Sequence, residues 1–70
     1  MQKIYISGSG GMLGEALYSV FKENYKLKCS DIDQNEDWID YLDFRNLNEY
    51  RNDVITFSPE YLFILVLLQT

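Results

Sequence analysis

A cluster of glycines near the N-terminus is the feature that most constrains the fold of this chain. All four glycines of the 70 residues fall within seven positions, Gly8-Ser9-Gly10-Gly11-Met12-Leu13-Gly14, between an apolar run at residues 4–6 and an amphipathic stretch over residues 12–25. Glycines let the backbone turn sharply out of a strand and let a phosphate reach main-chain N–H groups at a helix N-terminus, where the helix dipole favours negative charge. The order strand, turn, helix therefore predicts a nucleotide-binding turn.

The spacing of these glycines distinguishes between kinds of phosphate site. The pattern is Gly8-x-x-Gly11-x-x-Gly14, and the strict G-x-G-x-x-G pattern fails because Leu13 stands where its third glycine would be. A P-loop is excluded because no Gly-Lys-Ser/Thr follows. A tight helix start that binds no ligand is the alternative interpretation of the same residues.

Composition limits the partners and the ligands. A net charge of −5 and a pI near 4.3 leave no basic stripe, so we expect no nucleic-acid partner. Residues 61–68 form an apolar run of eight residues, whereas a membrane helix needs about 20, and the first residues lack the charged and apolar regions expected of a signal peptide. We therefore expect a cytoplasmic protein with no membrane partner. Because histidine is absent and Cys29 is the single cysteine, we expect no disulfide within the chain, no metal site, and a buried Cys29.

The hydrophobic pattern predicts an α/β fold. We expect strands over residues 3–7, 26–31, 39–42 and 61–66, and helices over residues 12–25 and 47–57, the second capped by Asn46 and stopped by Ser58-Pro59. The order β-α-β-β-α-β is that of the first, mononucleotide-binding half of a Rossmann doubly wound parallel sheet, as one partial domain over residues 1–70.

The same pattern predicts which faces are buried. Residues 63–68 are continuously apolar, which suits a strand covered on both faces. The loop over residues 31–37 is acidic and is expected to be solvated. The inner faces of the two predicted helices are expected to carry Leu13, Ala16, Leu17, Val20 and Phe21 on the first, and Leu47, Tyr50, Val54 and Phe57 on the second.

An acidic residue ends the second predicted strand. Asp31 lies seventeen residues after Gly14, close to the spacing of about 20 at which a carboxylate binds the adenosine ribose of a dinucleotide. This carboxylate would repel a 2′-phosphate, which mildly favours NAD over NADP. Asp33 is an equal candidate by position alone, and a solvated loop acid is the plainer alternative. The loop is no EF-hand, because Glu36 replaces the required glycine and Leu42 the bidentate glutamate.

These residues together resemble the N-terminal portion of the extended short-chain dehydrogenase/reductases that act on nucleotide sugars. Residues 4–14 are similar to the opening strand and turn of that family, most nearly in its dTDP-4-dehydrorhamnose reductase-like and NAD-dependent epimerase/dehydratase members. The segment Tyr41-Leu42-Asp43-Phe44-Arg45-Asn46 resembles the family's Asp-hydrophobic pair after the third strand. The resemblance implies a cofactor-binding set made of Gly8, Gly11, Met12, Leu13, Gly14, Asp31, Asp43 and Phe44.

The resemblance also implies a role for each of these residues. Met12 and Leu13 would lie beside the pyrophosphate and Asp31 beside the adenosine ribose, while Asp43 would meet the adenine amino group and Phe44 would pack on its ring. Without the resemblance, Asp43 is a helix-flanking acid and Phe44 a core residue.

The resemblance covers residues 3 to about 65, which correspond to about the first quarter of a full family member. The family's catalytic Tyr-x-x-x-Lys pair and its nearby Ser/Thr lie well downstream of that portion, and the tyrosine acts as acid/base. Tyr18 and Lys22 match the spacing but lie on the first predicted helix, so we assign no catalytic residue and interpret Tyr18 as helix surface. We expect the NAD(P)-binding portion of a reductase, epimerase or dehydratase, inactive alone, with a nucleotide sugar as substrate only of a full-length parent.

The final segment departs from the family pattern. The family has small residues after its fourth strand, whereas Val66, Leu67 and Leu68 stand here. An apolar strand that stops so abruptly is an aggregation-prone edge, which suggests a truncated or frame-shifted product. Two alternatives remain open at this point: a stand-alone nucleotide-binding module, and an interaction fragment whose strand over residues 61–68 pairs with a partner or with a second copy.

Overall fold

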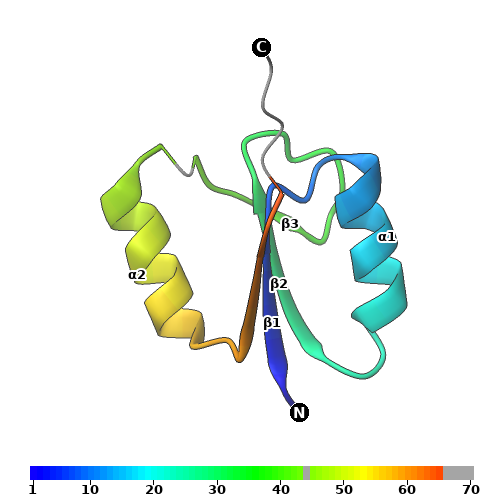
Figure 1. Cartoon of the computed structure of the whole chain (residues 1–70). Coiled ribbons are helices and arrows are strands. Elements are labelled where there is room, and N and C mark those ends of the chain that lie inside the picture. Colours follow the sequence, from blue (N-terminus) through cyan, green and yellow to red (C-terminus); the bar gives the residue numbers. More distant parts are fainter. Residues whose placement is uncertain (44, 66–70) are drawn as a thin grey trace.

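A computed structural model of the chain describes residues 1–43 and 45–65. In these residues the elements follow in the order β1 (Lys3–Ser7), α1 (Met12–Phe21), β2 (Lys26–Asp31), β3 (Ile39–Tyr41), α2 (Leu47–Phe57) and β4 (Tyr61–Ile64). The described strands form one parallel sheet in the order β3-β2-β1-β4. Figure 1 shows the sheet nearly edge-on, with α1 covering one face and α2 the other. The expected α/β class and parallel sheet are thereby confirmed.

Strand β1 lies in the interior of the sheet. It pairs with β2 on one side, where Ile6 lies opposite Cys29, and with β4 on the other, where Ile6 lies opposite Phe63. Its residues from Ile4 to Ser7 are all buried. A short apolar run suits this position, because an interior strand of a parallel sheet is covered on both faces by helices.

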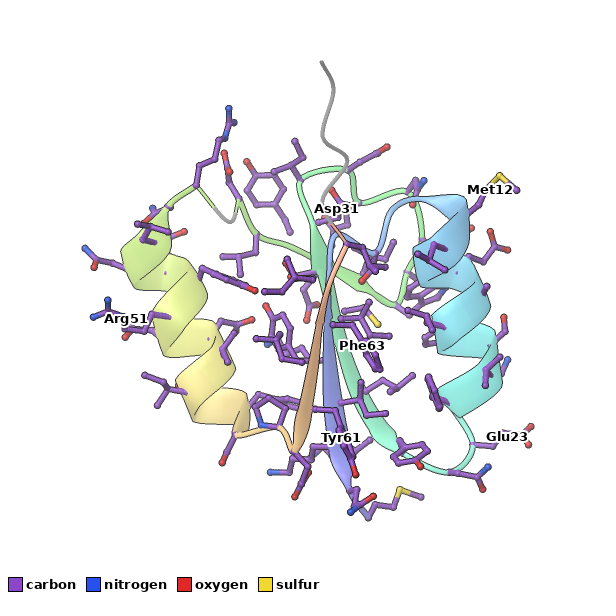
Figure 2. The ribbon with its side chains drawn as sticks, viewed as in Figure 1. Met12, Glu23, Asp31, Arg51, Tyr61 and Phe63 are labelled. Carbon is purple, nitrogen blue, oxygen red and sulfur yellow. The ribbon has the colours of Figure 1, made fainter. Side chains whose placement is uncertain are left out.

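The face of the sheet beneath α1 holds the apolar core. Ile4, Ile6 and Cys29 point to this face and form the buried cluster. Helix α1 packs on it with Phe21 and with Leu17 and Tyr18, which lie four and three residues before Phe21. In Figure 2, Phe63 of β4 lies between the sheet and α1, and its ring stacks with that of Phe21 at a centroid distance of 6.2 Å. Burial raises the pKa of the Cys29 thiol to about 11 and confirms Cys29 as a core residue.

The predicted inner face of α1 is wrong in three of its five residues. Leu13 and Val20 are 61% and 66% exposed, and Ala16 is exposed as well. The buried stripe begins instead at Gly14, which lies against the backbone of Ser9 and is followed on the inner face by Leu17, Tyr18 and Phe21. The helix also ends at Phe21 rather than near Tyr25.

The opposite face, beneath α2, combines polar groups with aromatic rings, since Tyr50 and Phe57 of α2 lie edge-on to Tyr5. Side chains alternate along a strand, so Tyr5 and its neighbour Lys28 point away from the apolar core. Asp53 of α2 reaches between them: its Oδ2 accepts a hydrogen bond from the Tyr5 hydroxyl at 2.6 Å, and its Oδ1 lies 2.9 Å from the Lys28 Nζ. Burial, together with the hydrogen bond to Asp53, raises the pKa of Tyr5 well above its usual value. The same carboxylate raises the pKa of Lys28.

This network corrects the predicted inner face of α2. Tyr50, Val54 and Phe57 are half-buried as expected, but Leu47 is 68% exposed and Asp53 joins the inner face in its place. Asn46 does cap the helix, since its Oδ1 accepts a hydrogen bond from the Glu49 N–H at 3.4 Å.

Strand β4 is not covered on both faces, which corrects the prediction from its apolar run. Tyr61, Leu62 and Ile64 are 50%, 42% and 55% exposed. The physical reason is its position, because β4 pairs with β1 and has no second neighbour among the described strands. The strand ends at Ile64, so the expected continuation is wrong at Leu65, and its last residue, Val66, lies outside the described residues.

Over residues 1–43 and 45–65, neither helix has the length and apolar character needed to cross a membrane.

Candidate functional site

A cleft of about 720 Å³ opens at the carboxyl edge of the sheet. This volume is within the range of small-molecule sites, and the carboxyl edge is where open parallel sheets bind ligands. Figure 2 shows Asp31 at this edge and Met12 at the start of α1. The described residues that line the cleft are Ser7, Gly8, Gly11, Met12, Leu13, Gly14, Asp31, Ile32, Leu42, Ile64 and Leu65.

Gly8 forms the turn that leaves β1. Its φ of +82° lies in the left-handed region, which side chains disfavour, and a Cβ there would collide with the carbonyl of Leu65. The turn is fixed because the N–H groups of Gly8 and Ser9 both donate to the carbonyl of Ser30, at 2.8 and 3.0 Å. Gly8 is therefore required by the fold itself, at the floor of the cleft.

Gly14 and Gly11 differ in what surrounds them. A Cβ on Gly14 would collide with the backbone of Ser9, so this glycine lets α1 pack on the turn. A Cβ on Gly11 would meet no described atom within 4 Å. Close packing among residues 1–43 and 45–65 thus explains why position 14 is a glycine. The same packing gives no reason for the glycine at position 11, which lines the cleft.

The first turn of α1 lies at the same place, and its N–H groups have no side-chain partner among residues 1–43 and 45–65. Gly11 occupies the N-cap position. The first N–H groups of a helix have no partner within the helix and bind water or a ligand instead. Met12 is 89% exposed beside them, so this end of α1 is open to solvent.

The structure brings Asp31 to the glycine turn. Its Oδ2 accepts a hydrogen bond from the Gly10 N–H at 2.7 Å, and its Oδ1 accepts one from the Asp33 N–H at 3.1 Å. Asp31 lines the cleft, whereas Asp33 is exposed and is not among the described lining residues. Of the two acids that the spacing leaves open, Asp31 is the one that a ligand in the cleft would meet.

Asp43 lies apart from the described lining of the cleft. Its carboxylate binds the Arg45 guanidinium, with Nη2 to Oδ2 at 2.7 Å and Nε to Oδ1 at 2.9 Å. These hydrogen bonds lower the pKa of the Asp43 carboxyl to about 2. The residue predicted beside it, Phe44, lies outside the described residues.

Tyr18 is not helix surface, which corrects its interpretation from the sequence. It is half-buried, and its ring stacks on Trp38 with centroids 4.0 Å apart and planes 7° apart. Lys22 lies over the same ring, with its Nζ 5.7 Å from the centroid. Neither residue is among the described residues that line the cleft.

The cofactor-binding set predicted from the sequence lacks five residues that line the cleft: Ser7, Ile32, Leu42, Ile64 and Leu65. A usable signal was present, because each ends a strand or follows one within one residue. The carboxyl ends of parallel strands meet at one edge, so residues at those positions converge. For the part of the chain that the structure describes, no group of three or more His, Cys, Asp or Glu side chains is placed to hold a metal ion.

Comparison with models of protein families, with curated proteins and with solved structures found no match for this chain.

The contrast between Gly11 and Gly14 gives a matched pair of serine substitutions. We expect Gly14→Ser to lower the free energy of unfolding by about 1–3 kcal/mol, because its Cβ collides with the Ser9 backbone. Gly11→Ser should leave the stability unchanged or slightly higher, because serine is a good N-cap residue and its Cβ enters open space. Urea unfolding followed by circular dichroism measures both, and equal losses in the two variants would contradict this account of the turn.

Proposed function

We propose that this chain is the NAD(P)-binding portion of an extended short-chain dehydrogenase/reductase that acts on a nucleotide sugar. The observation that carries the proposal is the open space at Gly11, in a cleft at the carboxyl edge of a parallel sheet and beside an uncapped helix N-terminus. A fold alone would not need a glycine at that position, whereas a pyrophosphate lying against the backbone would.

The strand order supports a half Rossmann fold. The described strands lie in the order β3-β2-β1-β4, which agrees with the first four positions of the doubly wound order 3-2-1-4-5-6. In such sheets the ligand binds where the order reverses, between the first and fourth strands. Gly8, after β1, and Leu65, after β4, both line the cleft at this point.

The lining residues suit an anion held by the backbone. No lysine or arginine is among the described residues of the cleft, so the N–H groups of the first turn of α1 would bind the pyrophosphate, with Met12 and Leu13 beside it. Asp31 would accept the hydroxyls of the adenosine ribose while it keeps its hydrogen bond to Gly10, since each carboxylate oxygen accepts more than one hydrogen bond. Its charge favours NAD over NADP.

The adenine end of the proposed site needs a rearrangement. Asp43 would have to exchange Arg45 for the adenine amino group, because each of its carboxylate oxygens already accepts two hydrogen bonds from Arg45. Ile32 and Leu42 already line the cleft and would supply apolar walls for the ring. No residue of this portion is assigned to hydride transfer, so we expect no turnover of a nucleotide sugar by the isolated chain.

Binding of NADH tests the proposal. We expect the chain to enhance NADH fluorescence on binding, and Gly11→Val to weaken that binding about tenfold or more, because the side chain fills space that the pyrophosphate would occupy. Ala16→Val is the matched control, since it places the same side chain on an exposed position of α1 outside the described lining of the cleft. Ligand at 100 times its dissociation constant should also stabilise the fold by about 2.7 kcal/mol.

Two results would contradict the proposal. One is that the chain does not enhance the fluorescence of NADH and that neither NAD nor NADH changes its melting temperature. The other is a Gly11→Val variant that binds as tightly as the wild type.

A second candidate function is self-association through β4. Tyr61, Leu62 and Ile64 are exposed on a strand that has one neighbour among the described strands and carries no charged residue. The other edge strand, β3, is only three residues long and has Asp40 at its centre. Proteins protect their sheet edges with such charges and short lengths, so β4 is the edge suited to pairing with a second copy.

A lysine on the edge tests this candidate. We expect the wild-type mass in analytical ultracentrifugation to rise with concentration, and Leu62→Lys to hold the chain monomeric, because a charged edge strand resists pairing. Val20→Lys is the control, as Val20 is an exposed residue on α1, far along the chain from β4. A wild-type chain that stays monomeric at all concentrations would exclude the candidate.

A further inference from the structure

The loop between β2 and β3 is held against the start and the side of α1. At its far end Trp38 stacks on Tyr18, with ring centroids 4.0 Å apart. At its near end the loop binds the peptide groups of the glycine turn, in contacts that involve Asp31 and Asn35. The loop is exposed to solvent as its acidic sequence predicts, yet it is anchored at both ends.

Gly10 is bound through both of its main-chain polar groups, by the last residue of β2 and by this loop. Its N–H donates to the Asp31 Oδ2 at 2.7 Å, and its carbonyl accepts a hydrogen bond from the Asn35 Nδ2 at 3.0 Å. The fit is close, because a Cβ on Gly10 would lie 2.9 Å from the Asp31 Oδ2 and 2.9 Å from the Asp33 carbonyl oxygen. Of these contacts, the one from Asn35 acts on the peptide that joins Gly10 to Gly11 and holds its carbonyl toward the loop.

We propose that Asn35 is a positioning residue for nucleotide binding, an inference that rests on the proposed function of the cleft. In a trans peptide the carbonyl and the following N–H point to opposite sides. By holding the Gly10 carbonyl toward the loop, Asn35 fixes the Gly11 N–H in the opposite direction, at a residue that lines the cleft. A rotated peptide would turn a carbonyl oxygen toward the pyrophosphate, and the two would repel each other.

The residue type at position 35 suits this role. An amide donates a hydrogen bond without adding charge, whereas an aspartate would repel the Gly10 carbonyl and add to the negative charge of Asp31 and Asp33. The other amide of the loop, Gln34, is already engaged, since its Nε2 donates to the Ile39 carbonyl at 2.7 Å. Asn35 is not among the described residues that line the cleft, so it acts through Gly10.

The test compares a ligand that carries a pyrophosphate with one that carries none. For Asn35→Ala we expect the affinities for NADH and ADP to fall about three- to tenfold, which is the effect of one hydrogen bond, and the affinity for adenosine to stay unchanged. Asn35→Asp should weaken ADP binding further. Asn48→Ala, at an exposed position of α2, is the matched control and should bind all three ligands as the wild type does.

A spectrum of the free protein provides an independent readout. The amide resonances of the four glycines are few enough to follow in a ¹H–¹⁵N correlation spectrum, and Asn35→Ala should shift those of Gly10 and Gly11 while the melting temperature stays close to that of the wild type. Unshifted Gly10 and Gly11 resonances, wild-type ADP affinity, or equal losses for ADP and adenosine would overturn the role of Asn35 alone. A wild-type chain that binds neither NADH nor ADP would instead overturn the proposed function, and this inference with it.

Discussion

The parallel pairing of β1 with both β2 and β4 is the constraint on which the candidate site depends. Because these strands run in the same direction, the turn after β1, the end of β2 and the end of β4 all meet at one edge of the sheet. Gly8, Asp31 and Leu65 therefore line a single cleft although they are far apart in the sequence. Opposite faces of the same sheet carry α1 and α2 (Figure 1).

The two faces of the sheet are held by different interactions. Apolar packing around Ile6 holds α1, while Asp53 binds Tyr5 and Lys28 beneath α2. The two faces differ because side chains alternate along β1. Every second side chain points toward α1, and those between them point toward α2. The helix that carries the glycine turn thus packs on the apolar face, where Gly14 and Ser9 bring it close to the end of β1.

Local sequence signals predicted the elements well, because they depend on neighbouring residues. The bounds of β1 and β2, the Asn46 cap and the place of Asp31 beside the glycine turn all agree with the structure. What could not be predicted depends on contacts between distant residues. Gly14 is buried because it lies against the backbone of Ser9, and Tyr18 is half-buried where its ring stacks on Trp38. No periodicity within a helix encodes such partners.

The most direct test of the central claim is to add NAD⁺ to the ¹⁵N-labelled chain and to record which amide resonances move. The account predicts shifts concentrated at the cleft, in Gly8, in the first turn of α1 from Gly11 to Gly14, and in Asp31. Resonances that do not move at saturating NAD⁺, or that move only in α2, would contradict it.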